Sequence, residues 1–235
     1  MSFKKSILIA GILLALSCHK TPKPETTMAF DTHFEILYGK VRQLYEMYRE
    51  GKEAQSDTDI NDFDIQGNIR QMKNTGSCNC SVKYEYKFDQ RGKKMELTVK
   101  SSQRLFPYTY KYDVNGYIIQ QTIDNKMLKP NSDHELMQDK FFYQYDSAGN
   151  RVREDYYYEQ EHKYHIIYKY NDKHVLLEQE YFYGDDEKPT NKITYRYTSF
   201  DGHGNWLRRV GQVKDYGSPA QEIHEPVVVR KIAYY

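Results

Sequence analysis

A six-residue turn motif recurs along this chain and constrains its fold more than any other feature. Its pattern is an aromatic residue, Asp, two variable residues, Gly and then often Asn. The six copies are Phe63–Asn68, Phe88–Lys93, Tyr112–Tyr117, Tyr145–Asn150, Tyr170–Val175 and Phe200–Asn205. The Asp can accept hydrogen bonds from backbone amides two or three residues further on, and Gly adopts a positive φ without steric cost. Each copy therefore predicts the turn of a β-hairpin.

The predicted turn-forming residues occupy the second and fifth positions of the motif. They are Asp64, Gly67, Asp89, Gly92, Asp113, Gly116, Asp146, Gly149, Asn171, His174, Asp201 and Gly204. In the fifth copy Asn171 keeps a short side-chain acceptor, and His174 is of a residue type enriched in left-handed conformations. The substitutions thus preserve the turn chemistry.

Aromatic residues alternate along the segments that precede the turns, as Tyr84, Tyr86 and Phe88 do. A period of two predicts β-strands and is incompatible with a helix. Before the last turn the alternation slips by one residue, which predicts a β-bulge near Thr198–Ser199. Successive turns lie 24 to 33 residues apart (89 to 113 and 113 to 146), a spacing typical of one supersecondary unit per repeat.

The Tyr-x-Tyr-Asp-x-x-Gly-Asn units resemble YD repeats, also called RHS-type repeats, as they occur in small lipoproteins of Bacteroidetes. Residues 37–42 resemble the opening strand of those proteins. Gly204-Asn205-Trp206 and residues 230–235 resemble their closing strands. The resemblance covers nearly the whole chain after its N-terminal segment. It implies a fold built from β-hairpins and brings no catalytic residues with it.

The expected fold is all-β: a single antiparallel meander of YD-type hairpins over residues 31–235, forming an extended, twisted or curved sheet. The strands alternate aromatic and charged residues, so one layer is expected rather than a thick two-sheet core. Tyr, with 24 copies, suits this design because its ring is buried while its hydroxyl stays hydrated. Residues 33–50 fit either an amphipathic helix or a strand, and Gly39 favours the strand.

The N-terminal segment has the layout of a signal peptide over residues 1–17. Lys4 and Lys5 precede an apolar run, Ile7–Leu16, that is too short to span a bilayer. The following Cys18 resembles a lipobox cysteine, so we expect lipidation at Cys18 and a tether over residues 18–30; ordinary secretion is the alternative. Acyl chains would make the membrane a partner. The expected location is the cell envelope, as an outer-membrane lipoprotein of undecided leaflet.

Three clusters of side chains are candidates for a metal or catalytic site. Cys78 and Cys80 lack a second pair of ligands at zinc-site spacing, which leaves two thiols or a disulfide. His162 and His165, three residues apart in a strand, would point to opposite faces. The acidic run at 185–187 offers oxygen ligands for calcium but also fits a solvated turn. No metal, no cofactor and no catalytic residue is predicted.

The sequence contains no Gly-x-Ser-x-Gly, His-Glu-x-x-His, P-loop or dinucleotide-binding motif. With a net charge of +1 and scattered Lys and Arg, no nucleic-acid partner is expected. The leading hypothesis is a membrane-anchored, non-catalytic binding or structural lipoprotein that presents a Tyr-rich β surface to a glycan or protein. One alternative is an envelope hydrolase with its site in the concavity of the sheet. Another is an accessory piece of an RHS-type toxin-delivery system.

Overall fold

The computed structural model describes residues 26–28, 36–49, 57–75, 80–100, 105–124, 138–217 and 225–235, and these form sixteen β-strands. The strands are β1 (Thr26–Met28), β2 (Ile36–Tyr38), β3 (Val41–Arg49), β4 (Asp57–Phe63), β5 (Ile69–Asn74), β6 (Ser81–Phe88), β7 (Lys94–Lys100), β8 (Leu105–Tyr112), β9 (Ile118–Asp124), β10 (Gln138–Tyr145), β11 (Arg151–Tyr158), β12 (Glu161–Tyr170), β13 (Leu176–Tyr183), β14 (Asn191–Phe200), β15 (Trp206–Asp215) and β16 (Val227–Tyr234). The predicted signal peptide, Cys18 and most of the predicted tether lie outside the described residues. Within those residues, no helix is long and apolar enough to cross a membrane.

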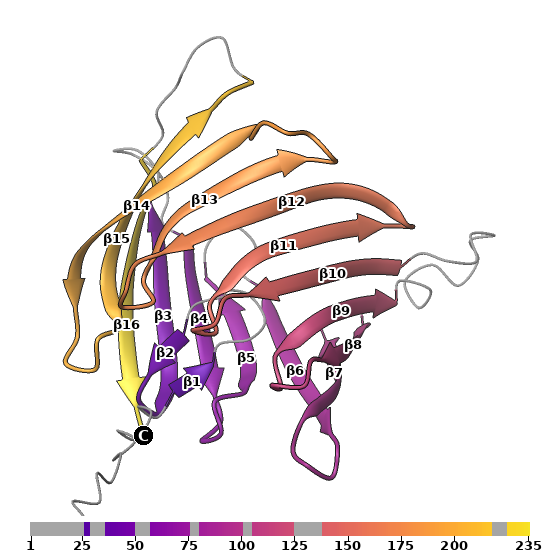
Figure 1. Ribbon diagram of the computed structural model, residues 1–235. Helices are drawn as coiled ribbons and strands as arrows, with labels where there is room; N and C mark the ends of the chain where they lie inside the picture. The colour runs from indigo at the N-terminus through magenta and orange to yellow at the C-terminus, as the bar shows by residue number, and fades with distance from the viewer. Residues whose placement is uncertain are drawn as a thin grey trace, which may run out of the picture.

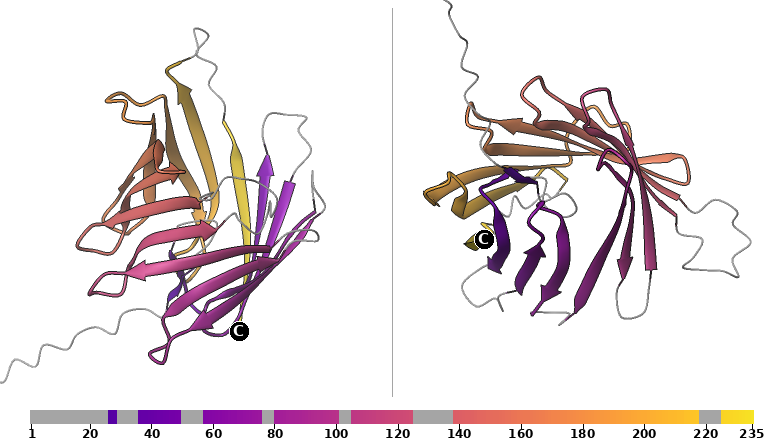
Figure 2. Two further views of the ribbon diagram at one scale, coloured as in Figure 1. Left: turned by 90° about the vertical axis from the view of Figure 1, so that its right-hand side faces the viewer. Right: turned by 90° about the horizontal axis from the view of Figure 1, so that it is seen from below.

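Fourteen strands, β3 to β16, form one closed antiparallel barrel (Figures 1 and 2). Each strand pairs with the next along the chain, and β16 pairs with β3 to close the ring. The all-β antiparallel meander is therefore as predicted, but the prediction of an open, extended sheet is wrong. An open sheet would leave its aromatic face without cover and β3 and β16 as unpaired edges. Closure removes both problems at once.

The connections of the meander alternate between two rims of the barrel. All six copies of the turn motif join an even-numbered strand to the following odd-numbered one, from β4–β5 to β14–β15, so they share one rim, here called the turn rim. The chain end lies at this rim too, because the Tyr235 amide donates to the Lys40 carbonyl at 3.0 Å. The opposite rim, here called the loop rim, carries two connections whose residues are all described, Glu159–Gln160 and residues 184–190.

The turn between β10 and β11 illustrates the motif geometry. Asp146 Oδ1 accepts the amides of Ala148 and Asn150, both at 2.9 Å. Gly149 has a φ of +88°, and the Asn150 side-chain amide donates to Asp146 Oδ2 at 2.8 Å. The other five copies repeat the two amide hydrogen bonds, and in the fifth copy His174 adopts a φ of +61°. Where the motif ends in Asn, at Asn68, Asn150 and Asn205, the side-chain amide also donates to the carboxylate that makes the turn.

Two local predictions are confirmed. The register between β14 and β15 shifts between Tyr197 and Ser199 and again before Phe200, which places a β-bulge where the alternation slipped. Residues 36–38 and 41–49 are strands, as Gly39 suggested, and Gly39 itself turns the chain between them with a φ of +83°.

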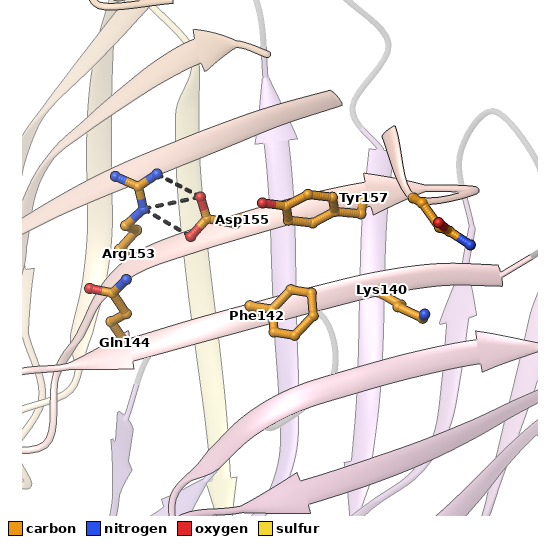
Figure 3. A pocket seen from close by; sticks show the side chains of 7 residues that line it. Lys140, Phe142, Gln144, Arg153, Asp155 and Tyr157 are labelled. Atoms are coloured by element: carbon orange, nitrogen blue, oxygen red, sulfur yellow. Dashed lines mark hydrogen bonds and ion pairs between the residues drawn. The ribbon is translucent and has the colours of Figure 1, made fainter. Parts of the chain in front are cut away.

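The outer face of the barrel is charged and polar. Cross-strand ion pairs such as Lys87–Glu96 (2.5 Å) and Lys192–Glu178 (2.8 Å) lie on it. Figure 3 shows side chains on this face of β10 and β11, which include charged, amide and aromatic groups. Like-facing cross-strand pairs of opposite charge stabilise a water-exposed sheet.

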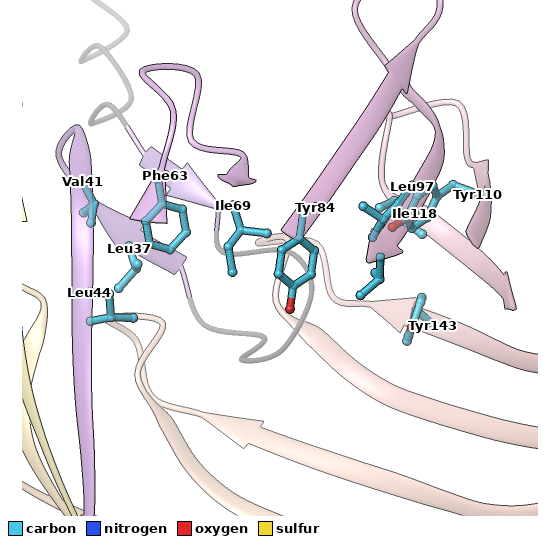
Figure 4. Packing of buried hydrophobic residues seen from close by; sticks show 11 residues of the cluster. Leu37, Val41, Leu44, Phe63, Ile69, Tyr84, Leu97, Tyr110, Ile118 and Tyr143 are labelled. Carbon is cyan, nitrogen blue, oxygen red and sulfur yellow. The ribbon is translucent and has the colours of Figure 1, made fainter. Parts of the chain in front are cut away.

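The inner face carries the aromatic and aliphatic side chains. The main cluster contains Leu37, Val41, Leu44, Phe63, Ile69, Tyr84, Leu97, Val99, Tyr110, Ile118 and Tyr143 (Figure 4). A second cluster is built on Ile166, Tyr168 and Leu176. Because Leu37 belongs to β2, the small β1–β2 sheet packs against the inner side of the barrel. The alternating Tyr residues of the sequence therefore point mainly inward.

A buried ion pair joins the first and last strands of the barrel. Arg230 on β16 contacts Glu46 on β3 through Nη2 at 2.7 Å and Nε at 2.8 Å, and both side chains are at most 2% exposed. The Trp206 ring lies 3.4 Å from the guanidinium. The Tyr48 hydroxyl donates to Glu46 at 3.3 Å, and burial raises the pKa of Tyr48. Two charges are thus fully compensated where the barrel closes.

Removing one member of this pair tests how much the pair contributes to the stability of the fold. We expect Glu46→Gln to lower the free energy of unfolding by about 3–5 kcal/mol, because Arg230 is left as a buried, uncompensated cation. The matched control Glu96→Gln, which breaks the exposed Lys87 pair, should change it by less than about 1 kcal/mol. Urea unfolding followed by tryptophan fluorescence measures both. Equal effects of the two substitutions would contradict a structural role for the pair.

The turn carboxylates predict a specific dependence on pH. Burial raises the pKa of Asp146, but hydrogen bonds from the side chain and amide of Asn150 and the amide of Ala148 outweigh it, so the pKa lies below its ordinary value of 3.8. Ionised Asp146 therefore stabilises the fold above that value, and the contribution disappears as pH falls through the lower pKa of the folded state.

We expect Asp146→Ala to cost about 1–3 kcal/mol at neutral pH, because two amides lose a charged acceptor. Asp146→Asn should cost less, since Asn171 serves in the fifth turn. Urea midpoints measured across a pH series should show the gap between the wild type and Asp146→Asn closing in acid. A gap that stays constant would show that the carboxylate charge is irrelevant.

Candidate functional site

A groove of about 500 Å³ lies on the outer wall over β10 and β11. Its lining comes from alternate positions of the two strands, which project to the same face. The lining residues are Lys140, Phe142 and Gln144 on β10, Arg153, Asp155 and Tyr157 on β11, and Gln160 in the next turn (Figure 3). In the ladder, Lys140 pairs with Tyr157, Phe142 with Asp155 and Gln144 with Arg153. Register therefore sets the composition of the groove.

Arg153 and Asp155 form a forked ion pair along one edge of this groove. Arg153 Nη2 lies 2.6 Å from Asp155 Oδ1, and Nε lies 2.8 Å from Oδ2. The hydrogen bonds that Arg153 donates to Asp155 raise the pKa of the guanidinium. Such a bidentate contact fixes the orientation of both groups. The groove thus presents immobilised donors and acceptors beside its aromatic rings.

A row of aromatic rings runs across four strands from the groove. Its members, here called the ring row, are Phe142, Tyr157, His162, His165 and Phe182. Successive ring centroids lie 5.5, 4.8, 5.6 and 4.4 Å apart. Tyr157 stacks on His162, and His165 stacks almost parallel to Phe182 at 7°. Mutual packing of the rings holds each of them in place.

The two histidines lie on the same outward face, contrary to the expectation from strand alternation. Between β11 and β12, Tyr156 pairs with Tyr164 whereas Tyr157 pairs with His162, so Lys163 is an extra, bulged residue. A β-bulge reverses the alternation beyond it. The prediction that His162 and His165 point to opposite faces is therefore wrong, because the strand between them is bulged and not regular.

The turn next to the groove, which joins β11 to β12, is not predicted from the sequence either. Glu159 and Gln160 both adopt positive φ, at 48° and 75°, as a two-residue hairpin loop requires. Such loops usually contain Asn or Gly, and this one contains neither. Its only sequence signal is the pair of aromatic-rich runs that flank two polar residues.

The predicted turn residues do not contribute to the groove, because they lie along the turn rim. The structure does bring two neighbouring turns together there: His174 Nδ1 lies 3.0 Å from Asn150 Oδ1. Cys18 and Cys78 lie outside the described residues, and Cys80 is disulfide-bonded. In the acidic run, Asp185 is directed to His162 Nδ1 at 2.6 Å.

The barrel interior holds a second buried carboxylate besides Glu46. Glu154 accepts a hydrogen bond from Arg151 at 3.2 Å and from the Tyr168 and Tyr164 hydroxyls at 3.3 and 3.4 Å. Burial raises the pKa of Glu154, against the opposing effect of Arg151. Both interior carboxylates are thus engaged by an arginine and a tyrosine, which accounts for them as structural ion pairs.

No family model and no curated protein matches the chain. A crystal structure of a porin-like protein from Bacteroides uniformis ATCC 8492 is similar with a TM-score of 0.52 and 10% sequence identity, over 82% of this chain and 98% of that one. At that identity the likeness shows the fold alone. The crystal structure of TcdB2-TccC3-TEV overlaps 76% of this chain and 11% of that one at a TM-score of 0.27 and 12% identity, which is too low to support an argument.

Proposed function

We propose that this protein is a non-catalytic binding lipoprotein of the bacterial cell envelope, related to YD-repeat proteins, whose outer groove binds a glycan. The observation that carries the proposal is the groove over β10 and β11, where two aromatic rings lie beside a fixed Arg153–Asp155 fork. Apolar surface combined with a few immobilised polar groups is the usual make-up of a small-ligand site.

The charged outer face favours a barrel that stands in water. A membrane-spanning barrel has an apolar outer band and a polar interior. Here ion pairs such as Lys87–Glu96 cover the outside, while Tyr84 and Tyr143 are buried inside. This distribution supports the proposal of a barrel that stands in water, with a lipid on Cys18 as its membrane attachment.

The place of β2 supports one orientation on that membrane. The side chain of Asn205, in the last turn of the turn rim, accepts a hydrogen bond from the Tyr38 amide at 2.7 Å and donates one to the Tyr38 carbonyl at 2.8 Å. Thr26 of β1 pairs with Tyr38, and the eight residues from Cys18 to Thr26 reach at most about 29 Å. The turn rim would therefore face the bilayer, leaving the groove near the loop rim accessible.

A glycan is the ligand class that matches the groove best. Several of the repeated Tyr residues, such as Tyr84, Tyr110 and Tyr143, are buried in the interior, so Phe142 and Tyr157 on the outer wall replace the Tyr-rich display surface expected from the sequence. Their rings offer flat apolar faces, while Gln144, Arg153 and Asp155 offer the donors and acceptors that hydroxyl groups require.

A glycan array followed by calorimetric titration of the best oligosaccharide tests this proposal. Phe142→Ala and Tyr157→Ala should each weaken binding about tenfold, the equivalent of about 1.4 kcal/mol. The matched control Phe88→Ala removes an exposed ring, 47% accessible, far from the groove and should leave affinity unchanged. Absence of any binding, or equal affinity of Phe142→Ala and the wild type, would refute the assignment.

An envelope hydrolase remains the second candidate, favoured by the 2.6 Å contact between His162 and Asp185. A histidine oriented by a carboxylate is a common general base. Product analysis of the same oligosaccharides by mass spectrometry separates the candidates. Intact glycans after prolonged incubation support the binding protein, whereas cleavage that His162→Gln abolishes would establish the hydrolase.

A further inference from the structure

We propose that Asp155, His162 and His165 form a binding site for a divalent transition-metal ion, with zinc as the best match, on the outer wall of the barrel. Each residue offers one ligand atom, and the three atoms lie within 4.8 Å of one another. Among the described residues this is the group of histidine, cysteine and carboxylate side chains that converges in this way. Regular strand alternation would place His162 and His165 on opposite faces, and only the bulge at Lys163 brings them together.

In both imidazoles Nδ1 already has a hydrogen-bond acceptor as its partner. His162 Nδ1 lies 2.6 Å from Asp185 Oδ1, and His165 Nδ1 lies 3.2 Å from the Gly184 carbonyl oxygen. Metal-binding histidines almost always donate their second N–H to a carboxylate or a backbone carbonyl. With both Nδ1 atoms used as donors, each Nε2 carries the lone pair that a metal ion requires.

His162 supplies an independent sign of a missing ligand. Its side chain is only 10% exposed, and its Nε2 is buried without a hydrogen-bond partner among the residues that the structure describes. Asp155 Oδ1 lies 3.5 Å from this nitrogen, longer than an ordinary N–H···O hydrogen bond. A buried polar atom without a partner is unfavourable unless a water or an ion satisfies it.

The dimensions fit a small ion after a modest contraction. Zinc bonds of about 2.0–2.2 Å to nitrogen and oxygen place tetrahedral ligand atoms roughly 3.4 Å apart. The observed limit of 4.8 Å thus requires shifts of about 1 Å, within reach of small side-chain rotations. Stacking on Tyr157 and Phe182 holds the two imidazoles from either side, so little further ordering is needed.

The donor set also suits a transition-metal ion. Asp155 contributes a negative charge, and its fork with Arg153 leaves lone pairs on both oxygens. Two imidazoles and one carboxylate match the donor preference of zinc and leave a fourth position open.

Calorimetric titration of the tag-free, full mature chain with zinc chloride tests the site directly. We expect one ion per chain and a loss of affinity of at least 100-fold in His162→Gln and in His165→Gln. Asp185→Asn, which removes only the acceptor behind His162, should weaken binding about tenfold. The matched control His203→Gln, an exposed histidine of the turn rim, should bind as the wild type does.

Cobalt chloride provides a second readout, because histidine-bound cobalt in a four- or five-coordinate site absorbs visible light strongly. The wild type should develop this absorption at one equivalent and His162→Gln should not. Circular dichroism establishes that each variant is folded, and Asp185→Asn serves as the decisive variant if a histidine substitution unfolds the chain. Absence of stoichiometric binding by the wild type, or wild-type binding by His162→Gln and His165→Gln, would overturn the proposal.

The metal site does not depend on the proposed glycan. Phe142→Ala should lose glycan affinity while keeping zinc, and His165→Gln should lose zinc while the groove rings remain. The two proposals can therefore fail separately. Because Asp155 lines the groove and also belongs to the metal cluster, glycan titration with and without zinc shows whether the two ligands are coupled.

Discussion

The pairing of β16 with β3 is the interaction on which the rest of the structure depends. It joins Val227–Tyr234 to Val41–Arg49 and turns a meander of hairpins into a ring. The buried Arg230–Glu46 ion pair lies within this ladder, under the Trp206 ring. Only once the ring is closed do the strands have an inside and an outside, and the alternation in the sequence then decides what each side contains.

That division explains why tyrosine is abundant without forming a display surface. Rings on one face fill the interior, and their hydroxyls find acceptors such as the Ile118 carbonyl for Tyr145 and the Leu176 carbonyl for Tyr197. The opposite face is left to ion pairs and, over β10 to β13, to the ring row. Recognition chemistry on this molecule is thus expected where the outer face departs from simple charge alternation.

The sequence predicted what depends on neighbouring residues. The hairpin turns follow from Asp, Asn and Gly within six residues, and the bulge at Thr198–Ser199 follows from a visible slip in alternation. Barrel closure was missed because it pairs segments at opposite ends of the chain, and no local pattern encodes that partner. The groove and the histidine cluster were missed for a related reason: both depend on cross-strand register, which the Glu159–Gln160 turn and the bulge at Lys163 set.

Hydrogen exchange followed residue by residue by NMR tests the closed barrel most directly. In an antiparallel sheet successive amides point to opposite neighbours, so an edge strand leaves every second amide unpaired. Closure predicts slow exchange for the successive amides of Leu44–Tyr48 on β3 and of Val227–Val229 on β16, the stretches that have a neighbouring strand on both sides. Fast exchange of alternate amides in both strands would mean that they are free edges, and would contradict the barrel.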